Sequence, residues 1–292
     1  MRKMLRKSSK NHTVICIFLL IFALGLACAP CKAETDNQKS FFRYSITAKP
    51  DYVLTLERGD YKSAIKEMRS LADKGDPYAQ YDLGLLYFRG AAGLTQNYKE
   101  AEKWWRKAAD QGLAEAQYDL STIYGAGKGV PQNYREASKW TRKAAEQNVS
   151  IAQYNLAKFY EEGLGGIVQD YKEAAKWYRK AAEQGYVNAQ HNLGVYYQKG
   201  FGVEQNYRES VKWYRKAAEQ GYVNSQLMLG DKYMTGKGVS RDYVQAYKWF
   251  YIAAQTGDKL AQQGLEILPK YMTERQIAEA IKLAKEEKIT GK

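Results

Sequence analysis

A block of about thirty-six residues is written five times along this chain, and the repetition limits what the chain can fold into. Each copy opens with AQYxLG and closes with NYxEAxKWYRKAAEQG, with small variations. A unit of this length holds two helices and a turn, so it cannot bury a core alone, and stability must come from stacked neighbours. The sequence therefore predicts an all-α array with a long surface, which favours binding of another macromolecule. The small residue that opens each unit recurs at Ala79, Ala116, Ala152, Ala189, Ser225 and Ala261.

The first part of the chain has the layout of a secretory signal peptide. Five cations precede the run Val14–Ala27, which is apolar but short for a membrane span. We expect cleavage after Ala33, so that residues 1–33 are removed and the protein is exported to a bacterial periplasm or secreted. A competing interpretation makes Cys28 a lipid-bearing residue, although glycine stands three positions earlier, where lipoprotein signals carry leucine.

Cleavage after Ala33 would change both the cysteine content and the charge. All three cysteines lie before that site, so the mature chain would have no disulfide and would depend on packing. The full chain carries a formal net charge of +13, from 45 basic and 32 acidic residues. Six cations lie in residues 1–33, which leaves 39 basic against 32 acidic residues, a net charge of +7. Because this excess is modest and spread over helix faces, we expect no nucleic-acid partner.

Spacing and capping signals define two helices within each unit. In the fourth unit Ala189, Leu193 and Tyr196 fall on one face of a first helix. After a glycine-containing turn, Asn206 with Glu209 predicts a capping box at the start of a second helix. Equivalent pairs are Asn97/Glu100, Asn133/Glu136, Asp170/Glu173 and Asp242/Gln245, and Thr273/Gln276 predicts a further helix near the end of the chain. The second helices are expected to end at Gly112, Asn148, Gly185, Gly221 and Gly257, where a left-handed backbone can stop them.

A tryptophan recurs at one position of every second helix. A series of this kind can serve as a sugar-binding ladder, but stacking repeats use a fixed aromatic residue to fill the groove between helix pairs. We therefore predict a structural role for these residues. They are Trp104, Trp140, Trp177, Trp213 and Trp249.

These motifs resemble the Sel-1-like repeat, a relative of the tetratricopeptide repeat. The resemblance rests on AQYxLGxxY, on the glycine loop, and on (N/D)Yx(E/Q)AxKWY followed by KAA(E/D)QG. It implies a right-handed αα-superhelical solenoid whose first helices line a concave surface. It divides the chain into a signal peptide (1–33), an irregular leader (34–50), an N-terminal capping half-repeat (51–78), five repeats (79–260) and C-terminal capping helices (261–292).

The resemblance also implies a function. Family members act as adaptors that hold protein complexes together, and secreted bacterial members are linked to the cell envelope or to host contact. The alternative is therefore a cell-wall role, in which the protein binds peptidoglycan or regulates an enzyme that acts on it. A subgroup with two cysteines in every repeat has been credited with β-lactam binding or hydrolysis, but this chain lacks those cysteines.

The sequence offers little support for catalysis. His191 is the one histidine after residue 33, and it occupies the position held by Tyr81, Tyr118 and Tyr154, which favours an aromatic replacement over a catalytic or metal-binding role. No GxSxG motif and no phosphate-binding glycine loop occur in the sequence. With no mature cysteine and one histidine, we expect no zinc site, no cofactor and no enzyme activity.

Partner-binding residues are expected on the first helices, where positions vary among units while the scaffold around them repeats. Lys158 and Lys232 predict a cationic groove that favours acidic segments of a protein or peptide. A third set of A-helix positions, the polar column, carries Asp or Asn. These side chains could hydrogen-bond an extended peptide, although packing within the repeat is the favoured alternative. We expect a monomer with no membrane-spanning segment after cleavage. One variable column is Leu85, Thr122, Lys158, Val195 and Lys232, a second is Phe88, Gly125, Glu161, Gln198 and Met234, and the polar column is Asp82, Asp119, Asn155 and Asn192.

Overall fold

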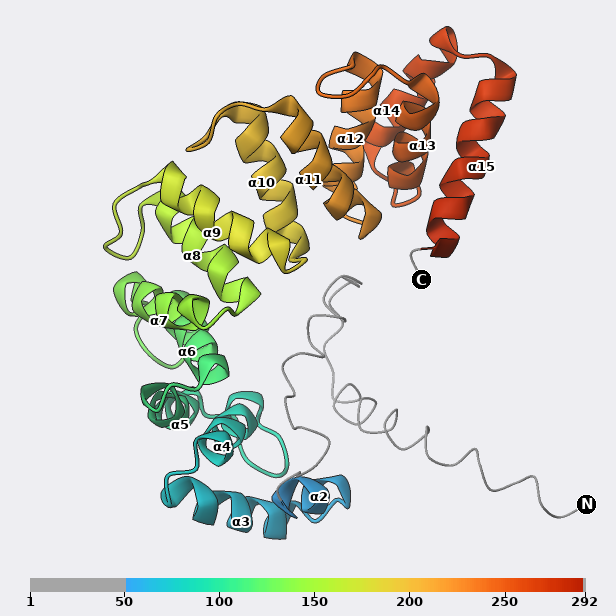
Figure 1. Ribbon diagram of the computed structural model, residues 1–292. Coiled ribbons are helices and arrows are strands. Elements are labelled where there is room, and N and C mark those ends of the chain that lie inside the picture. The colour runs from blue at the N-terminus through green and yellow to red at the C-terminus, as the bar shows by residue number, and fades with distance from the viewer. Residues whose placement is uncertain (1–50, 291–292) are drawn as a thin grey trace, which may run out of the picture.

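The computed structural model describes residues 51–290, so the signal peptide and leader expected within residues 1–50 lie outside the described residues. The described part of the chain forms fourteen α-helices and a short 3-10 helix, and it contains no strand. Consecutive helices pack in pairs, and the pairs follow one another along an arc from α2 to α15 (Figure 1). The all-α solenoid architecture is thereby confirmed.

Each repeat contains an A helix followed by a B helix. The A helices are α4 (Pro77–Arg89), α6 (Ala114–Ala126), α8 (Ser150–Glu162), α10 (Val187–Lys199) and α12 (Val223–Thr235). The B helices are α5 (Tyr98–Asp110), α7 (Tyr134–Glu146), α9 (Tyr171–Glu183), α11 (Tyr207–Glu219) and α13 (Tyr243–Ala254). Before them come α2 (Asp51–Glu57) and α3 (Tyr61–Asp73), and after them come α14 (Lys259–Ile267), η3 (Leu268–Tyr271) and α15 (Glu274–Thr290).

The B helices begin at the predicted caps, but the capping boxes form only in half. The Asn206 side chain accepts hydrogen bonds from the backbone N–H groups of Arg208 and Glu209, as an N-cap should. The backbone N–H of Asn206 instead donates to the Tyr197 carbonyl of the A helix at 2.8 Å, so the Glu209 carboxylate is not needed there. That carboxylate pairs with Lys212 three residues later. The same backbone bond joins Asn97 to Tyr87, Asn133 to Tyr124, Asp170 to Tyr160 and Asp242 to Tyr233.

The predicted ends of the helices are confirmed. The residue after each of the first four B helices is followed by one with positive φ: Gly112, Asn148, Gly185 and Gly221 have φ between 68° and 94°. The capping box at Thr273 forms in full, because Thr273 N–H donates to Gln276 Oε1 at 2.9 Å and Gln276 N–H donates to Thr273 Oγ1 at 3.3 Å.

The tryptophans pack between repeats, as predicted. Trp140 is 1% exposed and lies in a cluster with Ala108 and Ala109 of the preceding B helix and Leu120 of its own A helix. The Lys143 ammonium lies 4.1 Å from the centroid of the Trp140 ring, so that ring face is already covered. Lysines cover Trp104, Trp177, Trp213 and Trp249 in the same way. Trp177 differs in being only partly buried.

In repeats 2 to 5, a glycine in the A–B loop packs closely on the B helix of the preceding repeat. At Gly202, φ is +62° and an added Cβ would lie 2.2 Å from the backbone of Tyr171, so no other residue fits without a shift. Gly129, Gly165 and Gly238 meet Tyr98, Tyr134 and Tyr207 in the same way. The successive A–B loops therefore form one continuous edge of the solenoid.

The two ends of the array are closed differently. At the N-terminal end, Tyr52 of α2 is 1% exposed and donates a hydrogen bond to Asp82 at 2.8 Å. At the C-terminal end, α15 packs against α13 rather than pairing with α14 (Figure 1). Ala280 and Ala284 are buried there, and Lys248 of α13 lies 2.6 Å from Glu287 Oε2.

Candidate partner-binding surface

The polar column of the A helices joins neighbouring repeats. Tyr81 of the first repeat donates to Asp119 of the second at 3.0 Å. Burial raises the pKa of the Tyr154 hydroxyl in the third repeat, while Asn192 of the fourth lies beside this hydroxyl and favours its ionised form. Asp82 receives the Tyr52 hydroxyl, and Asn155 is half-buried at the equivalent position. The polar column is thus used by the scaffold, in contacts between repeats rather than within one.

Burial shifts the pKa of one group in this column and of two groups beside it. Burial raises the pKa of Asp119 to about 6, while the Tyr81 hydrogen bond and the Arg89 charge act in the opposite direction. The pKa of the Tyr81 hydroxyl is raised by burial and by the Asp119 carboxylate. In the fourth repeat, burial lowers the pKa of His191 to about 4, so this imidazole is neutral at pH 7.

His191 lies among aromatic side chains, as expected of an aromatic replacement. Its ring centroid is 5.0 Å from that of Tyr222 and 5.5 Å from that of Tyr214. Its Nδ1 is 2.8 Å from Ser225 Oγ in the next repeat. This contact joins two repeats, as the hydrogen bond from Tyr81 to Asp119 does.

Much of the second variable column varies because its partners inside the repeat vary. Glu161 accepts a hydrogen bond from Tyr178 at 2.6 Å, and Gln198 accepts one from Tyr214 at 3.1 Å. Phe88 instead packs on the Trp105 ring, with the two centroids 5.2 Å apart. Met234 packs in the cluster of Phe250 in the same manner, whereas Gly125 has no side chain to offer. An acceptor therefore faces a hydroxyl group and an apolar side chain faces an apolar ring, which accounts for this column without a partner.

Thr122 of the first variable column is exposed and Leu85, Lys158 and Val195 are half-buried, but Lys232 does not belong to this column. The residue of α12 equivalent to Val195 is Asp231, and Lys232 follows the buried column of Ile123 and Tyr196. Lys232 is 2% exposed, with its Nζ 3.3 Å from Asp231 Oδ2. The prediction that Lys232 meets a partner is therefore wrong, because its side chain lies inside the array. The corrected column is Leu85, Thr122, Lys158, Val195 and Asp231.

The predicted cationic groove is also wrong. The five A helices contain four basic and six acidic residues, and Lys158 lies 3.3 Å from Glu162. Each of α7, α9 and α11 carries four basic and two acidic residues. The net positive charge of the array therefore lies on the B helices, and the A helices give no preference for acidic segments.

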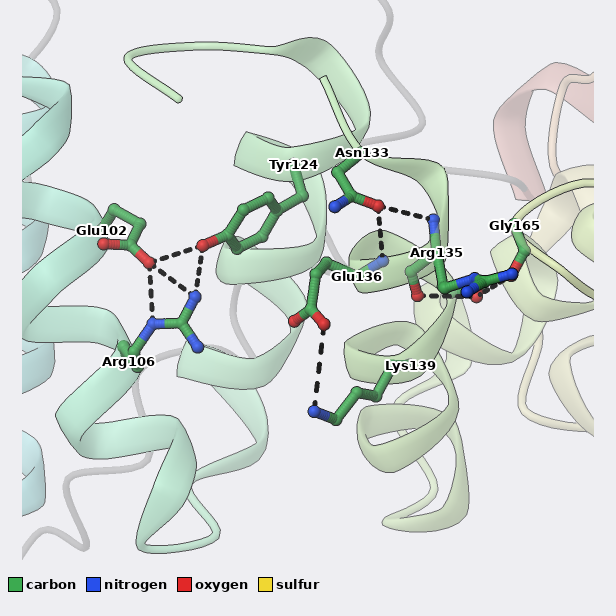
Figure 2. Close-up of polar contacts among 9 residues, drawn as sticks. Glu102, Arg106, Tyr124, Asn133, Arg135, Glu136, Lys139 and Gly165 are labelled. Carbon is green, nitrogen blue, oxygen red and sulfur yellow. Dashed lines mark hydrogen bonds and ion pairs between the residues drawn. The ribbon is translucent and has the colours of Figure 1, made fainter. Parts of the chain in front are cut away.

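The B-helix surface is largely occupied by contacts that recur in most repeats. An arginine of α5, α9 and α11 donates to a tyrosine of the next A helix eighteen residues later, as Arg215 does to Tyr233 at 2.6 Å. Arg142 of α7 lies over the Tyr160 ring instead, and α13 has no arginine. Figure 2 shows the version formed by Arg106 and Tyr124, in which both side chains also bind Glu102. The same view shows Asn133 capping α7 and Glu136 paired with Lys139.

Buried glutamines form a ladder that the sequence analysis missed. Gln190 is 4% exposed, and its amide N–H donates to the Ala182 carbonyl of the preceding repeat at 3.2 Å. Its Oε1 accepts from Gln220 at 2.7 Å, and Gln220 also reaches the Gly185 carbonyl at 3.2 Å. A glutamine after the opening alanine and another before the closing glycine recur in the repeats, and that pairing was the available signal. Equivalent pairs are Gln80/Gln111, Gln117/Gln147 and Gln153/Gln184.

Neither a metal centre nor a membrane span is found in residues 51–290. Within that range no group of three or more His, Cys, Asp or Glu side chains is arranged to hold a metal ion. No helix described there has the length and apolar character needed to cross a bilayer.

Comparison with known proteins matches this geometry to one repeat family. The family model described as Sel1 repeat matches residues 77–113, 114–149, 150–186, 187–222 and 223–258. These boundaries begin at Pro77, where α4 starts after its Asp76 cap, two residues before the opening alanine. No curated protein matches the chain.

Two solved structures are similar over most of the array. A Sel1 repeat protein from Oxalobacter formigenes is 33% identical, with a TM-score of 0.69, over 81% of this chain and 98% of that one. The protein c5321, described as a protective antigen in uropathogenic Escherichia coli strains with an SLR fold, is 31% identical with a TM-score of 0.53. That similarity covers 79% of this chain and 57% of c5321.

Proposed function

The chain belongs to the Sel1 repeat family, and we propose that it is an exported, non-catalytic scaffold that holds a protein or peptide against its A helices. Sel1 repeat proteins are generally protein-interaction scaffolds. An array of paired helices offers an extended surface, which suits a macromolecular ligand.

The observation that carries this proposal is the corrected first column of the A helices. It changes from apolar to hydroxyl, cationic, apolar and acidic along the five repeats, while the alanine, leucine and glutamine on the same helices recur. Thr122 is exposed, the Lys158 side chain is 45% exposed and that of Asp231 is 40% exposed. None of the five residues makes a side-chain hydrogen bond to another repeat among those found in the described part of the chain. Thr122 and the accessible parts of the four half-buried side chains are therefore what this column offers to a partner of mixed apolar and polar character.

Export is supported by the basic start, the apolar run and Ala33. If the proposal is right, intact-mass measurement of the secreted protein gives a chain that begins at Glu34 and carries no thiol. A diacylglycerol group on Cys28 or a retained Met1 would contradict it.

The test of the binding surface uses two lysines of the third repeat. Lys158 of α8 and Lys176 of α9 have side chains 45% and 57% exposed, and each is paired with a glutamate of its own helix. Affinity isolation from envelope extracts should retain a partner on the parent protein and on Lys176→Glu, but not on Lys158→Glu. The charge change is the same in both variants, so retention by Lys158→Glu with loss by Lys176→Glu would place the partner on the B helices.

The cell-wall alternative is weakened by the tryptophans. Glycan recognition commonly uses exposed aromatic faces, whereas Trp104, Trp140 and Trp213 are at most 9% exposed and each carries a lysine on its ring. Incubation of the purified protein with peptidoglycan fragments and with nitrocefin checks this directly. The scaffold proposal expects neither turnover nor saturable binding, and turnover of either substrate would contradict it.

A further inference from the structure

One edge of the solenoid is built from consecutive A–B loops. We use the term loop edge for loops 163–170 and 200–206 together with the first turns of α7, α9 and α11. Gly165 packs on the carbonyl of Tyr134 and Gly202 on that of Tyr171, so each loop touches the B helix before it. Figure 1 shows the α8–α9 and α10–α11 loops leaving the arc on its outer side.

Apolar side chains are exposed along this loop edge. Of the twelve large apolar side chains that are exposed in residues 51–287, six lie here, so the exposure is concentrated rather than scattered. Val168 is 85% exposed, and the rings of Tyr171 and Phe201 stack with centroids 5.3 Å apart. The stacking joins two repeats into one patch. The six residues are Tyr134, Leu164, Val168, Tyr171, Phe201 and Tyr207.

The six exposed apolar residues all lie in repeats 2 to 4, and the equivalent tyrosines of the first and fifth repeats are less exposed. In the first repeat, Tyr98 is partly covered by Phe88, whose ring centroid is 5.2 Å away. In the fifth repeat, Tyr243 is half-buried because Tyr271 of η3, itself 60% exposed, stacks on it at 5.5 Å. Exposed apolar side chains of the loops and first turns are therefore concentrated in repeats 2 to 4.

Cations flank the patch and have no acidic partner. Arg135, Lys172 and Arg208 each stand second in a B helix, all three are exposed, and none forms an ion pair within the described residues. Lys199 and Lys237 lie further along this edge, are also exposed, and form no ion pair within the described residues.

The acidic side chains of the loop edge are mostly engaged. Glu162 pairs with Lys158, Asp170 caps α9, and Glu173 and Glu209 pair with lysines one turn along their helices. Glu204 is the exposed acid that is left without an ion pair in the described part of the chain. The uncompensated charge of the loop edge is therefore positive.

We propose that the loop edge of repeats 2 to 4 docks on an anionic lipid surface. Tyrosine favours the membrane–water interface, where its ring meets lipid while its hydroxyl group stays hydrated, and phenylalanine contributes apolar area that enters the interfacial layer. Val168 and Phe201 enter the interfacial layer, and Arg135, Lys172 and Arg208 meet lipid phosphates around them. Leu164, Val168 and Phe201 lie in the loops, and the three tyrosines and three cations lie in the first turns of the B helices beside them, so apolar and cationic side chains alternate along one edge, as docking on an anionic lipid surface requires. The A-helix column takes no part, so this inference stands apart from the proposed partner site.

The experiment is sedimentation of the purified protein with vesicles of phosphatidylglycerol and, separately, of phosphatidylcholine. The parent should bind the first and not the second, and salt should weaken the binding. Lys172→Glu with Arg208→Glu should weaken binding by about tenfold or more, since each cation near an anionic surface contributes measurably. Val168→Glu, at a side chain that packs on little, should weaken binding by about severalfold.

A matched control uses two exposed lysines of α3. Lys62→Glu with Lys66→Glu makes the same charge change far along the array and should leave vesicle binding unchanged. Thermal unfolding of every variant checks that the fold is kept.

Three results would overturn the proposal. The first is a parent that ignores phosphatidylglycerol vesicles, and the second is an equal loss in the α3 control, which would indicate attraction by net charge alone. The third is a parent that elutes as a dimer which Val168→Glu converts to a monomer, because the patch would then join two copies of the chain.

Discussion

The A and B helices of the same five repeats use their surfaces in different ways. On the B helices most polar side chains recur with the same contact, as in the arginine that reaches the next tyrosine or the lysine that covers the tryptophan. On the A helices the buried side recurs, while the side facing away from the core changes from repeat to repeat.

The difference separates two causes of variation. Glu161 and Gln198 vary because Tyr178 and Tyr214 lie opposite them, whereas Phe88 faces a tryptophan. Val195 and Lys158 vary with no such partner in another repeat. Variation in a repeat protein therefore indicates a binding surface only after packing inside the repeat has been accounted for.

The largest effect is expected at the tryptophans of the B helices. Trp140→Ala should lower the free energy of unfolding by about 3 to 5 kcal/mol, because a fully buried ring between two repeats is lost. Trp177→Ala should cost less, since that ring is only partly buried. Denaturant unfolding of both variants measures the difference. Equal costs would show that burial does not set the contribution of these rings.

The next effect is expected at the loop glycines. Gly202→Ala should cost about 2 to 4 kcal/mol, because a methyl group would meet the Tyr171 backbone in addition to the strain of positive φ. Gly221→Ala is the control, with φ +87° and nothing within 4 Å of the added atom. It should cost about 1 to 2 kcal/mol, from backbone strain alone. If Gly221→Ala lowered the free energy of unfolding as much as Gly202→Ala, the close contact between repeats would not contribute to stability.

A smaller, pH-dependent gain in the free energy of unfolding is expected from a substitution at Asp119 on the A helices. The folded pKa of Asp119 is about 6 against 3.8 for an aspartate in water, so the folded state binds more protons between these values. The stability contributed by this proton is present below pH 3.8 and is lost as pH rises through 6. Asp119→Asn, which matches Asn155 and Asn192, should therefore raise stability at pH 7 by about 1 to 2 kcal/mol and have little effect at pH 4.

His191 should respond to pH in the opposite sense. Its folded pKa is about 4 against 6.5, so its contribution is present above pH 6.5 and is lost as pH falls through 4. Melting curves of the parent, Asp119→Asn and His191→Tyr between pH 4 and pH 8 separate the two groups. A pH profile of Asp119→Asn that parallels the parent would contradict the assignment of Asp119.

The sequence predicted the parts of this fold that rest on local rules. Helix caps, the glycines that end helices and the tryptophans between repeats follow from spacing, and the structure confirms them. The prediction from sequence failed where two acceptors compete for one backbone N–H group. The Asn206 N–H could bond Glu209 or the Tyr197 carbonyl, and only the packed A helix makes the second partner available.

The candidate site was less predictable for the same reason. A shift of one residue turns a helix by about 100°, and that shift moved Lys232 from the surface into the core. The position of α15 on α13 also has no local signal, because it depends on the face left open at the end of the array.

The smallest effect on stability is expected at Lys158, which is proposed to bind the partner, and at its control Lys176. Lys158→Glu and Lys176→Glu should each change the free energy of unfolding by less than about 0.5 kcal/mol, since both lysines form exposed ion pairs. Thermal unfolding checks this. A large loss in Lys158→Glu would mean that the A-helix column also serves the scaffold.

Site-specific photo-cross-linking can show directly whether the partner lies on the A helices. A photoreactive residue is placed at position 158 or 195 on the A helices, or at position 176 or 212 on the B helices, in cells that produce the protein. We expect positions 158 and 195 to capture one and the same protein and positions 176 and 212 not to capture it. Capture of that protein from positions 176 and 212, with none from 158 and 195, would contradict this expectation.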